Sequence, residues 1–305
     1  MKKKKRLIVL AAAAVIMTAL AGTSLYAKDL MEQKVKLAAA DAGAESFPVQ
    51  TQEAAADKSK PEQDMYAGEA QSVQGGEDHK GPADKDTPPE QKLVIALDPG
   101  HQGPGIDMSD MEEDAPGSGV MKQKNNSGTA GRYTGLPEYQ LNLDIALKVK
   151  ERLSRLGYEV VMSREDNDTA MSNQDRARQA NESGAVLCVR IHANGSESPE
   201  SAGALCLVMS EGNPYAGSLY NESSELASDI LEKYCTATGL QNRGIQISDS
   251  MTGINWSRIP VVILEMGFMT NEQEDRLMAD PAFQEKMAEG ITQGIEQYCL
   301  KLKDD

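Results

Sequence analysis

The chain has 305 residues and a formal net charge of −16, because 47 Asp and Glu residues outnumber 31 Lys and Arg residues. This charge argues against a nucleic-acid partner, since the phosphates would be repelled. The composition changes twice along the chain, which indicates three parts: residues 1–27, 28–92 and 93–305.

Residues 1–27 have the composition of an export signal. A positively charged run, Lys2–Arg6, precedes residues 7–27, which carry no charge and end in the small-residue sequence SLYA. This pattern is typical of a cleavable signal peptide, and the uncharged stretch is also long enough for an uncleaved membrane anchor. The positive flank places the N-terminus in the cytoplasm. We therefore expect an exported protein, either secreted or attached to the membrane through residues 7–27.

Residues 28–92 are rich in Ala, Glu, Asp, Lys, Gln, Pro and Gly and lack a periodic apolar pattern. Such a segment cannot bury enough apolar surface to offset its ordering entropy, so we expect a disordered acidic tether. A flexible chain of this length would span about 45 Å on average. His79, one of three histidines in the chain, is expected to be a solvated residue of the tether.

Residues 93–305 alternate between strand and helix patterns. The expected strands are apolar runs rich in β-branched residues, at 93–98, 158–163, 185–191, 203–210, 244–248 and 260–268. The expected helices carry apolar residues at helical spacing, at 137–157, 173–184, 222–239 and 281–303. The alternation predicts a single α/β domain, with a central, mostly parallel or mixed sheet and helices on both faces.

Four cysteines fall in this domain: Cys188, Cys206, Cys235 and Cys299. None shows the C-x-x-C spacing of a metal site. Export permits disulfides, but a core of this size needs no covalent cross-link, and buried free thiols pack as small apolar groups. We therefore expect free, packed thiols.

Polar residues stand at or just beyond the carboxyl ends of three expected strands: His101, His192 and Glu265. Functional groups gather at this edge of open α/β sheets. Two histidines and a carboxylate suit a catalytic zinc ion, which takes three protein ligands and keeps one position open. Hydrogen-bonded structural histidines are the alternative, and the residues alone leave the carboxylate ligand open. A phosphate-binding loop at 98–105 is disfavoured, because no Lys-Ser/Thr and no helix start follow it.

Four phrases occur in order along the domain: LDPGHQG, PEYQLNL, RIHAN and VVILEMGFMTN. Together they resemble the zinc-dependent N-acetylmuramoyl-L-alanine amidases (the amidase-3 family), and the resemblance covers roughly residues 93–300. It implies a hydrolase with one zinc ion per chain. The implied substrate is peptidoglycan, cut at the amide between N-acetylmuramic acid and the L-alanine of the stem peptide. Protein activators are not indicated by the sequence.

The resemblance assigns roles to individual residues. It makes His101, Glu138 and His192 the zinc ligands and Glu265 the catalytic carboxylate. Apart from the resemblance, Glu138 is an ordinary acid at a helix N-terminus, stabilised by the helix dipole. A buried carboxylate at the position of Glu265 would be costly without a purpose.

Asn194 and Arg243 also lie in phrases that resemble the family, and we consider them as substrate-binding residues, with structural hydrogen bonds as the alternative. The sequence departs from the family at residues 107–131, called the insertion below, which carries five acids between Asp107 and Asp114. A lid, a substrate-side wall and a tolerated surface insertion are all compatible with it. No cell-wall-binding repeat is recognised, so targeting is expected to rest on the tether or on partners.

Two other functions remain open. A different zinc peptidase, acting within the stem peptide, would use the same amide chemistry, and only its products would distinguish it. A non-catalytic wall-binding or regulatory module on the same fold is the second alternative. The presence of all four implied site residues argues against that module.

Overall fold

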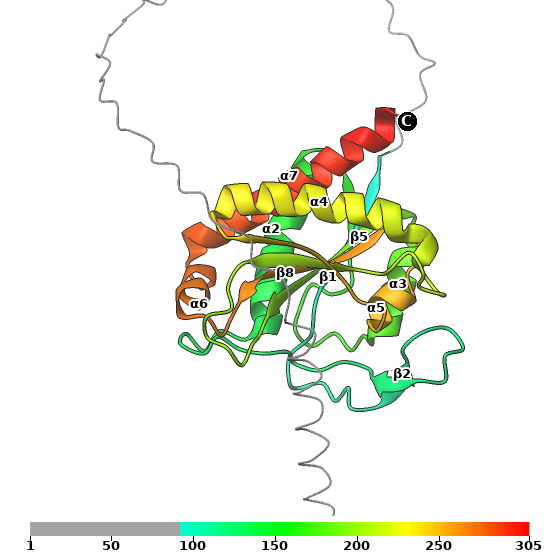
Figure 1. The fold of residues 1–305 in the computed structure, drawn as a ribbon, viewed down its shortest axis with the longest axis horizontal. Coiled ribbons are helices and arrows are strands. Elements are labelled where there is room, and N and C mark those ends of the chain that lie inside the picture. The colour runs from blue at the N-terminus through cyan, green and yellow to red at the C-terminus, as the bar shows by residue number, and fades with distance from the viewer. Residues whose placement is uncertain (1–91, 305) are drawn as a thin grey trace, which may run out of the picture. The chain divides into compact units, whose positions relative to one another are not determined.

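The computed structural model describes residues 92–304, so the predicted export signal, the tether and His79 lie outside the described residues. Six strands form one sheet in the order β4-β1-β5-β8-β6-β7 (Figure 1). Their bounds are β1 Val94–Pro99, β4 Glu159–Met162, β5 Ala185–Asn194, β6 Ala204–Val208, β7 Asn242–Ile247 and β8 Val261–Phe268. All neighbouring strands are parallel except β6 and β8, which are antiparallel. The predicted, mostly parallel or mixed sheet is therefore confirmed.

Helices cover both faces of the sheet, also as predicted. The helices α2, α4 and α7 pack together on one face, and α3 and α5 lie on the other (Figure 1). The helical bounds are α2 Glu138–Arg155, α3 Asn173–Glu182, η1 Gly217–Leu219, α4 Tyr220–Thr238, α5 Thr252–Asn255, α6 Glu272–Met278 and α7 Pro281–Asp304. Within residues 92–304 no helix is long and apolar enough to cross a membrane.

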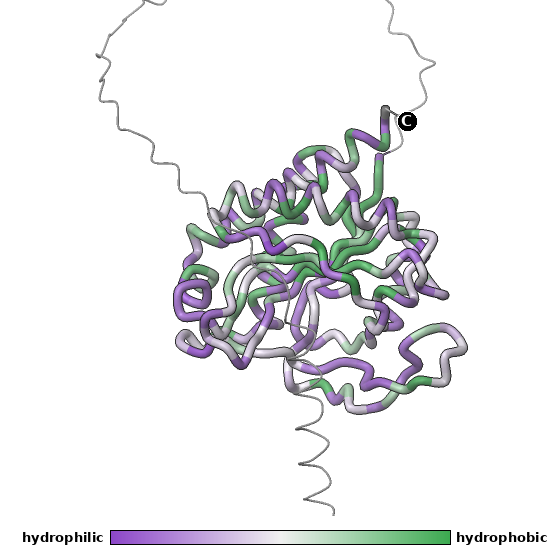
Figure 2. Tube along the Cα trace, viewed as in Figure 1, coloured by the Kyte–Doolittle hydropathy of each residue, from purple (hydrophilic) through white to green (hydrophobic). Residues whose placement is uncertain are grey.

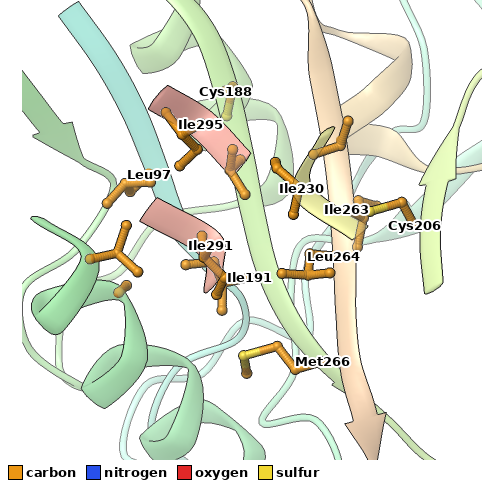
Figure 3. Close-up of a cluster of buried hydrophobic side chains, with 14 of the residues drawn as sticks. Leu97, Cys188, Ile191, Cys206, Ile230, Ile263, Leu264, Met266, Ile291 and Ile295 are labelled. Atoms are coloured by element: carbon orange, nitrogen blue, oxygen red, sulfur yellow. The ribbon is translucent and has the colours of Figure 1, made fainter. Parts of the chain in front are cut away.

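The core lies between the sheet and the three-helix face. Strand side chains such as Leu97, Ile191 and Leu264 meet Ile291 and Ile295 of α7, and all five are at most 1% exposed (Figure 3). Apolar residues are concentrated along the central strands (Figure 2). The four cysteines are free and are buried or half-buried, in agreement with the expectation. Each Å² of apolar surface that is buried here stabilises the fold by about 25 cal/mol. This stabilisation holds the central strands in place.

The insertion contains an antiparallel hairpin, formed by β2 (Met111–Glu113) and β3 (Met121–Gln123). The backbone N–H of Gln174, in the first turn of α3, donates to the Glu112 carboxylate at 3.2 Å. The indole of Trp256 donates to the backbone carbonyl of Glu113 at 3.0 Å. The backbone N–H of Asn173 donates to the carbonyl of Lys124 at 2.9 Å. The insertion is therefore docked against α3 and the end of α5.

Candidate metal centre

Three side chains converge at the carboxyl ends of the central strands. His101 lies on the loop after β1, Glu138 is the first residue of α2, and His192 lies near the end of β5. Nε2 of His101 is 3.1 Å from Oε1 of Glu138, and Nδ1 of His192 is 3.2 Å from the same oxygen. One ligand atom from each residue lies within 4.8 Å of the others. This spacing suits three ligands around a single metal ion.

The loop that carries His101 is held in a strained conformation. Among the residues that the structure describes, His101 is the one non-glycine residue with a positive φ, at 62°. Arg176 donates to the backbone carbonyls of His101 at 2.8 Å and Pro99 at 2.7 Å, and Arg164 donates to that of Gly100 at 3.0 Å. A left-handed conformation costs of order 1–3 kcal/mol and persists only where the surroundings enforce it. The two guanidinium groups supply that enforcement.

Beneath the loop lies a buried ion cluster centred on Asp98. The Asp98 carboxylate accepts from Arg176 and Arg190, each at 2.6 Å, and from the Ser163 hydroxyl at 2.5 Å. Burial by itself would raise the pKa of Asp98, but the two guanidinium groups and the hydroxyl hold it well below its usual range. The ionised carboxylate thus fixes two arginines under the candidate site.

Glu138 is held in the carboxylate form. Its carboxylate is almost fully buried and accepts from the backbone N–H groups of Thr129 at 2.9 Å and Ala193 at 3.2 Å, and from the Asn142 amide at 3.3 Å. Burial raises the pKa of Glu138, but hydrogen bonds from the two histidines outweigh this effect and leave the pKa well below its usual range. The N-terminus of α2 further favours negative charge.

Each of the two histidines has a ring nitrogen that can bind a metal ion. Burial lowers the pKa of His192 to about 4, so its ring is neutral near pH 7. Nδ1 of His101 lies 3.2 Å from the backbone carbonyl of Asn126, a residue of the insertion. When a metal ion replaces the proton on Nε2, a carbonyl at Nδ1 keeps the remaining proton of the ring there. Two neutral imidazoles and one carboxylate form a donor set that fits zinc.

Glu265 lies opposite His192 across the ladder between β8 and β5. Burial, followed by the negative charge of Glu138, raises the pKa of Glu265 to about 8. Two carboxyl groups near one site therefore have opposite tendencies, since Glu138 is held ionised and Glu265 readily takes a proton. Such a difference between neighbouring carboxyl groups is a signature of divided ligand and acid–base roles.

A cavity of about 210 Å³ opens beside the histidines, between the insertion, β5 and the segment around α5. Its lining residues are His101, Lys122, Gln123, Asn125, Asn126, Asn173, Arg190, His192, Ser250, Met251, Thr252, Gly253 and Ile263. The insertion supplies four of these residues, 122, 123, 125 and 126. It is therefore a wall of the site and not a remote surface insertion.

A sequence model of the amidase-3 family, described as N-acetylmuramoyl-L-alanine amidase, matches residues 95–297. The chain belongs to this family. The match covers the sheet from the second residue of β1 onward and every residue of the candidate site. The predicted family and the peptidoglycan amidase function that it implies are therefore supported by the same stretch of chain.

Relatives of this amidase include LytC of Bacillus subtilis, which is 31% identical over 175 residues that cover 57% of this chain and 33% of LytC. AmiA of Escherichia coli is 27% identical over 244 residues, covering 68% of this chain and 76% of AmiA. The chain thus spans a third of LytC but most of AmiA. Among solved structures, Ami1 of Mycobacterium smegmatis superposes with a TM-score of 0.62 at 28% identity, covering 68% of this chain and 97% of Ami1.

Asn194 and Arg243, the two candidates for substrate binding, are not among the lining residues of the cavity beside the histidines. The Asn194 side chain accepts from the backbone N–H of Gly195 at 2.8 Å. Arg243, on the edge strand β7, donates to the carbonyl of Ala202 at 3.0 Å and lies 5.4 Å over the ring of Phe268. The structure thus gives both residues structural contacts, and their role in substrate binding stays a prediction.

Proposed function

We propose that the protein hydrolyses the amide between the lactyl group of N-acetylmuramic acid and L-alanine in peptidoglycan, with one zinc ion per chain. The observation that carries the proposal is the convergence of His101, Glu138 and His192 beside Glu265 in a chain of the amidase-3 family. A bound zinc ion would polarise the scissile carbonyl and make an adjacent water more acidic.

The protein's residues prepare this chemistry before substrate arrives. His192 presents a neutral nitrogen, and Glu138 presents a carboxylate whose second oxygen is occupied by the N–H of Thr129. The Asn126 carbonyl fixes the His101 ring, and Arg176 fixes the His101 backbone. Ligands held in this way bind without large rearrangement.

Glu265 moves the proton. Its carboxylate accepts a proton from the attacking water, whose oxygen bonds to the scissile carbonyl carbon. The protonated Glu265 then delivers the proton to the departing nitrogen as the C–N bond breaks. The second proton of the water stays on the new muramic acid carboxyl group and is then lost to the free L-alanine amino group, which gives a carboxylate and an ammonium group as products. A pKa raised towards neutrality suits a group that both accepts and donates.

Product analysis tests the proposal. The full chain, loaded with zinc, is incubated with purified peptidoglycan, and the soluble products are identified by mass spectrometry. We expect peptides that begin with free L-alanine and glycan strands of unchanged length. New amino termini within the stem peptide would instead establish the alternative zinc peptidase, and an absence of any cleavage would favour the non-catalytic module.

We also propose that the protein acts outside the cytoplasm, secreted or attached through residues 7–27. The support is the charged run followed by the uncharged segment in residues 1–27. This location agrees with a cell-wall substrate. Comparing the protein's apparent mass and N-terminal sequence in culture medium and membrane fractions distinguishes a cleaved signal from an anchor.

A further inference from the structure

The cavity beside the candidate metal site differs in charge from the rest of the protein. The protein has 47 acidic and 31 basic residues, yet no Asp or Glu is among the described residues that line this cavity. Apart from the two histidines, its ionisable lining residues are Lys122 and Arg190. The two charged residues of an otherwise neutral lining are thus both cations, which favours an anionic ligand group.

The buried cluster around Asp98, to which Arg190 of the lining belongs, adds to this positive charge. Arg190 and Arg176 share one carboxylate, that of Asp98, as hydrogen-bonding partner. In the described chain Arg164 donates only to backbone carbonyls and to the Asn167 amide oxygen. Three buried guanidinium groups thus accompany one ion-paired carboxylate. Their side chains are at most 5% exposed, so these arginines mainly set the local potential, and a ligand contact is expected from a more exposed residue of the lining.

Lys122 is that residue. It projects from β3 of the insertion, and its ammonium group donates to the backbone carbonyl of Ser250 across the cavity. The Asp114 carboxylate lies 3.7 Å away and forms an ion pair with Lys122 that is longer than a hydrogen bond. An ammonium group has three N–H donors, so donors remain for a ligand. Because the insertion is docked against α3 and α5, this cation stays fixed beside the histidines.

The substrate of the proposed reaction has one neutral and one anionic side. The glycan strand is bulky and its N-acetylated sugars are uncharged, whereas the stem peptide is narrow and carries carboxylates. A cavity of about 210 Å³ admits the peptide residues next to the scissile bond but not a sugar polymer. A free carboxylate on the second stem residue lies about two residue lengths, roughly 7 Å, beyond the scissile nitrogen.

We propose that Lys122 binds the free α-carboxylate of the second stem residue, a D-glutamate, and that the insertion thereby determines which stem peptides are cleaved. This inference rests on the proposed amidase function. It assigns to the insertion a substrate-binding role that depends on one charged side chain.

The test compares two soluble glycan–peptide substrates that differ only in the second stem residue, whose carboxylate is free in one and amidated in the other. We expect the zinc-loaded full chain to show a kcat/KM about fivefold higher on the free-carboxylate form, as one partly exposed ion pair provides at most. Lys122→Met should abolish this preference, mainly through KM, and Lys122→Glu should reverse it.

The matched control is Lys124→Met. Lys124 lies one residue beyond β3 and is 36% exposed, compared with 37% for Lys122, but its ammonium group pairs with Asp110 at 3.3 Å and it does not line the cavity. The control should keep the preference of the wild type. A purely structural role for Lys122 would lower kcat/KM equally on both substrates.

Each outcome decides one question. If the wild type cleaves neither substrate at the muramoyl–L-alanine bond, the proposed function is wrong. If it cleaves both without preference, or if Lys122→Met keeps the wild-type preference, the function stands and the role of Lys122 is overturned.

Discussion

His192 and Glu265 are Cα partners on the adjacent parallel strands β5 and β8. Partners in a ladder lie about 4.8 Å apart and direct their side chains to the same face of the sheet. The spacing between a candidate metal ligand and the candidate proton acceptor is therefore set by the backbone hydrogen bonds of two central strands. Changing the chemistry of one side chain should leave the position of the other intact.

Glu265→Gln tests this separation. The amide keeps the shape of the carboxyl group and removes its ability to accept the water's proton. We expect full zinc content, an unchanged fold and a loss of about two to four orders of magnitude in turnover, which is the usual contribution of general acid–base catalysis. Metal analysis and peptidoglycan digestion on the same preparation measure both properties. Turnover at the wild-type level would show that another group moves the proton.

The raised pKa of Glu265 predicts how the stability of the metal-free protein depends on pH. Burial and the charge of Glu138 raise the pKa of Glu265 from 4.5 to about 8 in the folded state, so the folded protein binds the extra proton between these values. Below pH 4.5 the carboxyl group is protonated in both states, and burying it as a carboxylate costs nothing. As the pH rises from 4.5 to 8, this cost lowers the free energy of unfolding by up to about 1.4 kcal/mol per pH unit.

Glu265→Gln should therefore gain stability over the wild type as the pH rises from 5 to 8, and the difference should then level off. Urea unfolding of both metal-free proteins at pH 5, 7 and 9 measures it. Parallel pH profiles would show that the carboxyl group titrates at its ordinary pKa in the folded protein.

The metal ligands make a separate prediction. The full chain should bind one zinc ion, and His192→Ala should lose it, because only two protein ligands remain. His79→Ala is the matched control, since His79 belongs to the predicted tether, and it should retain zinc. Chelation should lower the unfolding temperature of the wild type but not of His192→Ala, because only a protein that binds the metal ion is stabilised by it. Equal zinc content in the two variants would contradict the assignment.

The sequence predicted the long elements of the fold because their patterns are repeated over many residues. β8 is an apolar run, and α2 carries an apolar stripe over 18 residues. The three-residue strands of the insertion and the four-residue helix α5 are too short to show a period. The seven-residue α6 did carry a signal that was missed, since Asn271 caps it and three acids follow in its first turn.

The candidate site likewise contains residues that the sequence indicates and residues that it does not. His101, His192 and Glu265 were indicated by their places at strand ends, whereas Glu138 followed only from the family resemblance, because acids are common at helix N-termini. Arg176 was not predicted as part of the site. It is 2% exposed and contacts the His101 loop 75 residues away, and such burial depends on tertiary contacts that a local pattern does not contain.

Gly128, in the insertion, provides a test of how closely the surroundings fit the ligands. Its φ is 73°, and a Cβ atom there would lie 2.4 Å from Oε2 of Glu138 and 2.8 Å from Cδ2 of His101. Gly135 has nearly the same φ, 74°, but a Cβ atom there would meet nothing within 4 Å. Both alanine variants incur the same left-handed strain, of order 1–2 kcal/mol, and only Gly128→Ala displaces the ligands.

We therefore expect the two variants to unfold at similarly reduced temperatures when metal-free, but to differ in zinc affinity. Gly135→Ala should bind zinc as the wild type does, whereas Gly128→Ala should bind it about 10- to 100-fold more weakly, as is usual when the surroundings of a ligand are disturbed. Competition with a chelator of known affinity measures the difference. Equal affinities would mean that the ligands tolerate displacement by the added methyl group, and the close packing of the insertion against Glu138 and His101 would then have no part in holding the metal ion.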